Sequence, residues 1–255
     1  MPASDLYKKF EYISNIDQIA GRHGMKIEVS SDFEAFRQLR CGQQKRAPLS
    51  PIFDCRTTDL NDANGFWIKG TSEDGELVHL QAVRLEDLTG LCLAEHLYKQ
   101  REVYAPPGVE VDLERTDYAA TPASHRITGK VCYHGELWLK GGPNGYRGHG
   151  LTAALPRLAL ALAHMAWSPD FMFGLMHPIV ACKGLPAREG YMHLEPGGIL
   201  WQRKDSEEIY DEWLVWMGHT DLQHLLRFPP LALYEQLEAQ SKDSTAFTSR
   251  VRAAA

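Results

Sequence analysis

One short segment constrains the fold of this chain more than any other, and it reads GGPNGYRGHGLT over residues 141–152. Five glycines and a proline lie here between two strongly apolar segments. Glycine loses more conformational freedom on folding than any other residue, so a glycine-rich segment costs stability unless its bare backbone serves a purpose. Two such purposes are a plain turn between a strand and a helix, and a loop that holds phosphate groups against the backbone.

The segments around this loop alternate between strand and helix patterns. Short apolar runs predict strands over residues 130–139 and 171–176. Residues 152–167 carry the clearest helical pattern in the chain. A further helix is expected over residues 178–188, because a proline is tolerated in the first turn of a helix. The loop therefore lies after a strand and before a long helix.

The N-terminal part of the chain predicts three helices, a single strand and a hairpin. Ser31 or Asp32 is a good N-cap for the second helix, which carries Phe33, Phe36 and Leu39. The sequence Ser-Glu-Asp-Gly over 72–75 favours a hairpin turn. The expected elements are helices over 5–23, from 33 onward and over 86–99, and strands over 25–29, 65–70 and 76–85.

An insertion and several short elements make up the rest. Residues 101–128 are rich in prolines and polar residues and are long for a structureless loop, so we interpret them as an insertion that shapes a substrate pocket. A second hairpin is expected around Pro196-Gly197-Gly198. The remaining expected elements are its strands over 191–195 and 199–203, helices over 207–217, 221–228 and 231–240, and a disordered tail over 241–255.

This order of elements predicts an α/β chain in which helices pack on a mixed sheet. No segment has the composition of a linker that would divide the chain, so we expect residues 1–240 to form a single domain. The N-terminal residues are polar, and no apolar run reaches the length of a membrane span.

Charge and cysteine content limit the classes of function. The formal net charge of −6 argues against a general role in binding nucleic acid or membrane surfaces. The five cysteines are odd in number and widely spaced, which is typical of reduced thiols in a cytoplasmic protein. No Cys-x-x-Cys or His-x-x-x-His pair is present, so the sequence predicts no metal site.

A nucleotide-phosphate loop fits the glycine segment poorly. Gly145 and Gly150 have the spacing of the two glycines in a Walker A loop, which continues with Lys and then Ser or Thr. Here Leu151 and Thr152 follow, so the lysine that reaches the phosphates is missing. The Gly-x-Gly-x-x-Gly pattern of dinucleotide-binding folds is absent from the segment as well.

The segment from Tyr146 to Thr152 instead resembles motif A of the GNAT acyltransferase superfamily. That motif reads Gln or Arg, two residues, Gly, one residue, then Gly or Ala. Arg147 and Gly150 occupy its first two fixed positions, and Thr152 departs from the third. The resemblance implies a GNAT-like α/β (α+β) fold: a central mixed, mostly antiparallel sheet flanked by helices, with a long insertion before the fourth strand and extra C-terminal helices.

The resemblance also implies how a donor binds. The first amides of a helix have no internal partner and lie at the positive end of its dipole, so they bind phosphate. In the family, these amides hold the pyrophosphate of acetyl-CoA or another acyl-CoA, and the strand before the loop splays from its neighbour and receives the thioester arm. The implied cofactor-binding residues are Leu139, Lys140, Arg147, Gly148, His149, Gly150, Leu151 and Thr152. The backbone N–H of Leu139 or Lys140 would polarise the thioester carbonyl.

Glu136 is the expected catalytic base. It lies eleven residues before Arg147, an offset that resembles the position of a glutamate base in several GNAT acetyltransferases. Its alternatives are a polar residue at a strand edge or an anion that binds substrate. His134 is a weaker candidate for the base.

The general acid stays open. A segment resembling motif B ends at Tyr191, but the tyrosine that many members carry five residues earlier is replaced by Pro186. Water, or a residue from elsewhere in the chain, could serve instead.

The resemblance implies an acyl-CoA-dependent N-acyltransferase that acts on an amine of a small molecule or a protein. Residues 101–128 and the region around Phe66 and Trp67 would line the acceptor pocket. Two alternatives remain: an N-acyl amino acid synthase-like enzyme that takes its acyl group from an acyl-carrier protein, and a non-catalytic binding module with the same fold. A homodimer is left open.

Overall fold

The computed structural model describes residues 3–43, 45–118, 120–204, 206–236 and 239, and seven strands in these residues form one sheet. The strand order is β1-β2-β3-β4-β5-β7-β6. All neighbouring strands are antiparallel except β4 and β5, which are parallel. The strands are β1 (Met25–Ser30), β2 (Gly65–Ser72), β3 (Leu77–Leu88), β4 (Gly129–Leu139), β5 (Phe171–Met176), β6 (His193–Gln202) and β7 (Ile209–Gly218).

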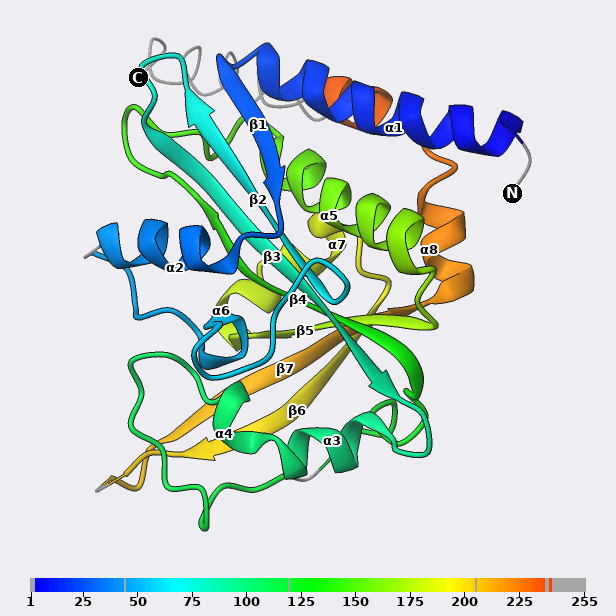
Figure 1. Cartoon of the computed structure of the whole chain (residues 1–255). Helices are drawn as coiled ribbons and strands as arrows, with labels where there is room; N and C mark the ends of the chain where they lie inside the picture. Colours follow the sequence, from blue (N-terminus) through cyan, green and yellow to red (C-terminus); the bar gives the residue numbers. More distant parts are fainter. Residues whose placement is uncertain (1–2, 44, 119, 205, 237–238, 240–255) are drawn as a thin grey trace, which may run out of the picture.

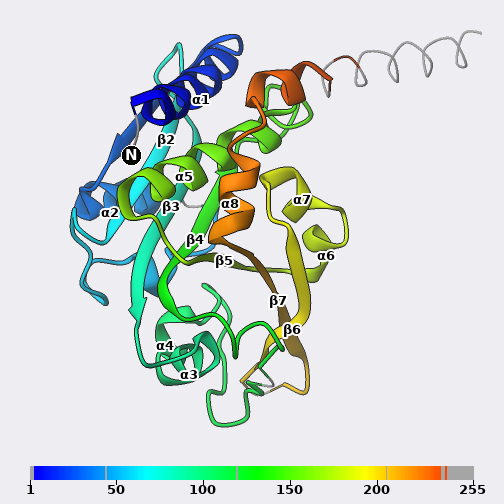
Figure 2. The same ribbon diagram turned by 90° about the vertical axis from the view of Figure 1, so that its right-hand side faces the viewer.

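Helices cover both faces of the sheet (Figures 1 and 2). On one face, α1, α5 and α8 contribute to one hydrophobic core. On the other face, α2, η1, α3 and α4 contribute to a second core. The elements are α1 (Ala3–Gly21), α2 (Phe33–Gly42), η1 (Pro51–Phe53), α3 (Leu93–Lys99), α4 (Arg101–Tyr104), α5 (Leu151–Trp167), α6 (Pro178–Ala181), α7 (Leu185–Glu189) and α8 (His219–Leu225).

The two cores explain the apolar sequence of the central strands. Along β2, Phe66 and Ile68 face the core under α1 and α5, whereas Trp67 faces the core under α2. A strand buried on both faces reads as a continuous apolar run instead of an alternating one. The predicted mixed sheet, mostly antiparallel and flanked by helices, is thereby confirmed.

The parallel pair β4–β5 separates along its length. The two strands pair only between residues 131–133 and 171–173, although both continue beyond these residues. On its other edge, β4 shifts register against β3 between Gly135 and Trp138, where Glu136 has a positive φ of 55°. From His134 to Leu139, β4 therefore presents an open edge toward β5.

The insertion before the fourth strand is present as predicted. After the short helix α4, the chain runs along β6 and forms isolated bridges from Val111 to Arg203 and from Asp117 to Leu200. The ring of Tyr118 meets the ring of Trp201 edge to face at 5.9 Å. These contacts tie the insertion to the edge of the sheet.

Over residues 191–217 the predicted strand residues lie mostly in a strand, but the predicted hairpin and helix are wrong. The expected second hairpin is a single strand, β6, with a register shift between Glu195 and Ile199, and the expected helix over 207–217 is strand β7. The Pro-Gly-Gly sequence marks this irregularity instead of a turn, because a Cβ at Gly198 would lie 2.8 Å from the β7 backbone. The sequence of β7 is rich in residues that favour strands, and its Leu214 and Val215 enter opposite cores.

Other boundaries also differ from the expectations. The helix expected over 86–99 begins only at Leu93, since β3 continues to Leu88. The helix expected over 178–188 is divided into α6 and α7 at Gly184, whose φ is +74°. Extra C-terminal helices are present as α8 and residues 230–236, and the predicted tail over 241–255 lies outside the described residues. No helix in the described part of the chain is long and apolar enough to cross a membrane.

Candidate active site

The glycine loop connects the end of β4 to the start of α5. Gly150 is the N-cap of α5 and adopts a left-handed conformation (φ 75°), which a residue with a Cβ adopts only with strain. No side chain caps this helix, and the amide of Ala153 bonds back to the Gly150 carbonyl. The amides of Leu151 and Thr152 have no hydrogen-bond partner among the described residues. The helix start therefore offers free donors, as predicted.

Arg147 is anchored beside this helix start. Its Nε donates to the Leu139 carbonyl at 2.8 Å, so the guanidinium is fixed at the end of β4. The residue is exposed, and its terminal nitrogens have no partner among the described residues. They remain available to an anion at the mouth of the loop.

A cavity of about 620 Å³ lies between the end of β4, the loop, the start of α5 and the segment from α6 to α7. It brings together six of the eight predicted cofactor residues: Leu139, Arg147, Gly148, Gly150, Leu151 and Thr152. Lys183 and Arg188 add two further cations to its lining. We call this the donor cavity.

The side chains of the other two predicted cofactor residues make contacts outside this cavity. Lys140 directs its ammonium group to Glu76 at 2.6 Å, and its amide bonds to the Val78 carbonyl at 2.8 Å. The ring of His149 lies against that of His23, with 5.4 Å between centroids. Because consecutive amides of a strand point to opposite edges, the Leu139 amide faces the open edge of β4 and is the better placed of the two predicted backbone donors.

A second cavity of about 330 Å³ lies on the other side of the gap between β4 and β5. Leu137, Val180 and Leu185 line both cavities, so the two meet where the strands separate. From the insertion, Pro107 lines this cavity, whereas Phe66 and Trp67 are buried in the two cores and do not. We call this the acceptor cavity.

Glu136 lines the acceptor cavity but is held by three donors. Its Oε2 accepts from Arg40 Nε at 2.6 Å and from a terminal nitrogen of Arg46 at 3.3 Å. Its Oε1 accepts from the Ser50 amide at 2.9 Å. The side chains of Glu136 and Arg40 are 4% and 2% exposed. Both carboxylate oxygens are thus engaged in a buried ion-pair network.

Arg46 is the member of this network with the weakest pairing. Its contact to Glu136 is longer than that of Arg40, and its guanidinium also lies over the Trp138 ring at 5.4 Å. Burial and the nearby Arg40 lower the pKa of Arg46 to about 10. The residue remains charged at neutral pH.

Two other carboxyl groups line the acceptor cavity. Glu212 on β7 accepts from Trp201 Nε1 at 2.8 Å through Oε2, and Oε1 has no partner among the described residues. Burial raises the pKa of Glu212 to about 7. Glu189 on α7 is 2% exposed, its carboxyl group makes no hydrogen bond with a described residue, and burial raises its pKa to about 8.

A chain of hydrogen bonds crosses from this cavity to α5. Gln81 donates from Nε2 to the Leu155 carbonyl at 2.7 Å, so its Oε1 must accept from His134 Nε2 at 3.0 Å. His134 Nδ1 then accepts from the Tyr191 hydroxyl at 3.2 Å. Burial lowers the pKa of His134 to about 4, so the ring is neutral. These contacts make His134 a structural group.

Sequence reasoning missed Glu212, Glu189, Arg40 and Arg46. Glu212 lies in a segment predicted to be a helix, where its neighbours would have been different. Arg40 and Arg46 are 96 and 90 residues away from Glu136 in the sequence, so only the folded chain brings them together. Glu189 lies inside the segment that resembles motif B, beside Arg188 and Gly190, and nothing in this local sequence indicates that it is buried.

No protein-family model and no curated protein matches the chain. Solved structures with a similar path include a spermidine N-acetyltransferase from Vibrio cholerae (TM-score 0.43, 7% identity, 78% of this chain and 96% of that one). An N-acyl amino acid synthase from uncultured soil microbes has a TM-score of 0.43 at 8% identity over 79% and 93% of the two chains. An aminoglycoside acetyltransferase solved with coenzyme A and kanamycin has a TM-score of 0.42 at 10% identity over 78% and 98%.

At such low sequence identities and TM-scores, these three structures do not show which reaction this chain catalyses. The mixed, mostly antiparallel sheet, the parallel pair that separates and the glycine loop before α5 are those that the sequence resemblance implied. The chain therefore has a GNAT-like α/β fold.

Proposed function

We propose that this chain is an acyl-CoA-dependent N-acyltransferase, which moves an acyl group from a coenzyme A thioester to an amine. One observation carries the proposal: a helix start with free amides lines a cavity that meets a second, carboxyl-lined cavity at the gap between β4 and β5. A donor bound at the helix start could thus extend its thioester to the gap, where an amine from the other side could reach it. Such positioning is a large part of catalysis of a two-substrate reaction.

On the donor side, the amides of Leu151 and Thr152 and the guanidinium of Arg147 would hold the pyrophosphate. Lys183 and Arg188 would add positive charge at the same cavity. The Leu139 amide, which faces the open edge of β4, would donate to the thioester carbonyl oxygen. A donor at this oxygen stabilises the negative charge that develops there as the amine attacks.

On the acceptor side, we assign the general base to Glu212. Glu212 lines the cavity, its Oε1 has no partner among the described residues, and a base works best when its pKa lies near the working pH. The base role of Glu136 stays a prediction, and its contacts favour a different task. With both oxygens engaged by donors, Glu136 would fix Arg40, Arg46 and the chain at Ser50 around the cavity.

The experiment that tests this function is a binding and turnover screen. Native mass spectrometry with acetyl-CoA and longer acyl-CoA would reveal a bound donor, and a panel of amines would reveal release of free thiol. We expect one donor per chain and turnover with at least one amine. Turnover with an acyl-carrier protein but not with acyl-CoA would favour the synthase-like alternative. Donor binding without turnover on any amine would favour the binding module.

Replacing Arg147 with alanine is expected to weaken coenzyme A binding by about tenfold, the usual loss for a charge-assisted hydrogen bond. The loss should shrink at high salt because the guanidinium is exposed. Calorimetric titration at two salt concentrations measures both effects. Lys140→Ala is the matched control, because the Lys140 ammonium is paired with Glu76 and should leave the affinity unchanged. If the Arg147→Ala variant and the original protein bind coenzyme A with equal affinity, Arg147 does not contact this ligand.

A further inference from the structure

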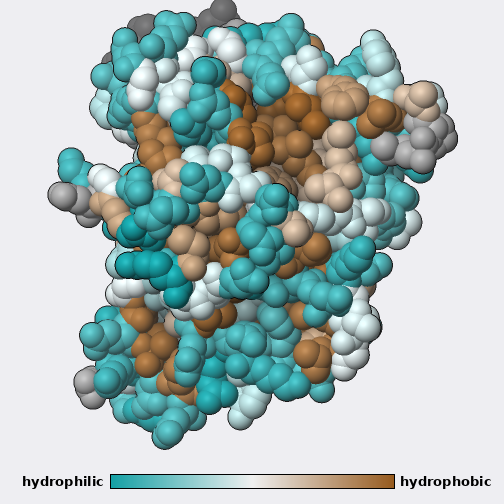
Figure 3. Space-filling model, viewed as in Figure 1, coloured by the Kyte–Doolittle hydropathy of each residue, from teal (hydrophilic) through white to brown (hydrophobic). Residues whose placement is uncertain are grey.

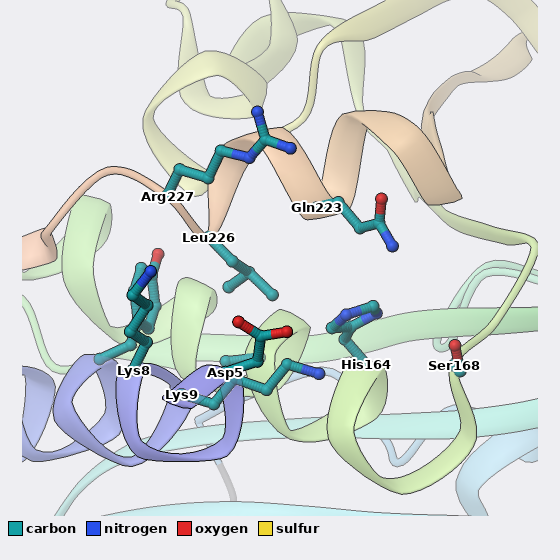
Figure 4. Close-up of a pocket in the computed structure, with 10 residues that line it drawn as sticks. Asp5, Lys8, Lys9, His164, Ser168, Gln223, Leu226 and Arg227 are labelled. Carbon is teal, nitrogen blue, oxygen red and sulfur yellow. The ribbon is translucent and has the colours of Figure 1, made fainter. Parts of the chain in front are cut away.

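A third cavity of about 630 Å³ lies between α1, α5 and α8 (Figure 4). It shares no lining residue with the donor or acceptor cavity. Tyr12, Ala161 and Leu226 supply apolar walls, and polar side chains from all three helices surround them. Apolar residues with a few converging polar groups, in a volume of this order, are typical of small-molecule sites. Figure 3 shows hydrophobic residues gathered on this side of the molecule along α1 and α5.

The charges around this cavity are unbalanced. Lys8, Lys9 and Arg227 supply three cations, and Asp5 supplies the single carboxylate of the lining. None of these four side chains forms an ion pair with another residue that the structure describes. Arg227 lies at the rim with its guanidinium turned away from Asp5, whereas the Lys9 side chain extends toward His164 (Figure 4). The excess positive charge is thus only partly offset within the chain.

His164 supplies a second, independent observation. It is 6% exposed, lines the cavity from α5, and its Nδ1 is buried without a hydrogen-bond partner among the described residues. A buried polar atom without a partner is costly, which is why such atoms in folded proteins usually have one. Burial, together with Lys9 and the neighbouring His219, lowers the pKa of His164 to about 4. The ring is therefore neutral and carries both a donor and an acceptor nitrogen.

We propose that this cavity binds a small organic anion, an apolar body that carries a carboxylate or phosphate group, with the anionic group at Lys9 and His164. The anion would balance the excess cations and accept a hydrogen bond from Nε2 of His164, the ring nitrogen that, unlike Nδ1, is not fully buried. The apolar body would lie against Tyr12, Ala161 and Leu226. This site does not depend on the acyl-transfer proposal, because it uses none of the residues of the donor or acceptor cavity.

The test follows the His164 ring by nuclear magnetic resonance in the whole chain, with its signals assigned through a His164→Gln variant. Benzoate and phenyl phosphate are the probes, benzamide is the neutral probe of similar shape, and inorganic phosphate carries charge without an apolar body. We expect benzoate and phenyl phosphate to shift the His164 signals saturably. Benzamide and inorganic phosphate should bind at least tenfold more weakly. The pKa of His164 should rise on binding, because an adjacent anion favours the charged ring.

Two variants make the result specific. Lys9→Gln should weaken benzoate binding about tenfold, as expected for loss of a charged partner. Lys26→Gln removes a lysine of β1 that pairs with Glu28 and should leave binding unchanged. The proposal is overturned if benzamide binds as tightly as benzoate, if Lys9→Gln has no effect, or if the probes shift other histidines but not His164.

Discussion

The Glu136→Gln variant is expected to lose roughly 3–5 kcal/mol of the free energy of unfolding, the usual cost of breaking a buried ion pair from one side. The Arg40 side chain is 2% exposed and bonds to Glu136 at 2.6 Å, so the variant would leave a buried guanidinium without its counter-ion. Urea denaturation at neutral pH measures the loss. Glu207→Gln is the matched control, because its pair with Arg115 is exposed and should contribute little.

A double variant tests whether the loss belongs to this pair. Arg40→Met with Glu136→Gln removes both charges, so we expect it to be less destabilised than the sum of the two single variants. Strict additivity would mean that the two side chains do not interact energetically. Turnover of the folded Glu136→Gln variant bears on the base assignment as well. A drop of about a hundredfold or more would restore Glu136 as the base, because a general base contributes at least that much.

The Glu212→Gln variant is expected to reduce kcat by a factor of about 10² to 10⁴, the usual contribution of a general base. The amide keeps the shape of the side chain and can still accept from Trp201, so the fold and donor binding should be unchanged. Steady-state kinetics with the best amine, together with donor affinity by calorimetry, measures these quantities. A variant with unchanged kcat would exclude Glu212 as the base.

The pH dependence of kcat/KM of the original protein should also reflect the titration of Glu212. Burial raises the pKa of Glu212 to about 7, and a base must be deprotonated to accept a proton. Below this pH, kcat/KM should fall as Glu212 becomes protonated, and above it kcat/KM should level off. Glu189→Gln is the matched control. Burial raises the pKa of Glu189 to about 8, so this carboxyl group is mostly protonated at neutral pH. Replacing it with an uncharged amide should therefore leave kcat/KM at neutral pH unchanged.

Local sequence patterns were sufficient to predict that the glycine loop and the start of a long helix lie together. The glycines and Arg147 lie within one short segment, and the long apolar helix after it is unambiguous, so neighbouring residues determine the geometry. The structure brings six of the eight expected residues to one cavity. Lys140 and His149 do not line this cavity, because their side chains contact residues from distant parts of the chain. Lys140 pairs with Glu76 on the turn between β2 and β3, and His149 contacts His23 after α1.

The acceptor side could not be predicted in the same way. Its groups come from α2, β4, α7 and β7, which meet only in the folded chain. β7 was predicted to be a helix, because a strand buried on both faces lacks the alternation by which strands are identified. Among the partners of Glu136, Arg40 lies near the end of α2, whereas Arg46 and Ser50 lie in a segment after α2 that has no pattern of its own. Pairing between distant segments, and the desolvation it causes, determines which carboxyl group is free to take a proton.

Titration of isotope-labelled protein with coenzyme A, followed through the backbone amide signals, tests the central claim most directly. We expect the Leu151 and Thr152 amides to shift saturably, with the dissociation constant that calorimetry gives for the same ligand. This result would place the diphosphate at the free donors of the α5 start. If saturating coenzyme A shifts neither amide signal, the diphosphate does not bind at the start of α5. The donor cavity would then not be the coenzyme A site.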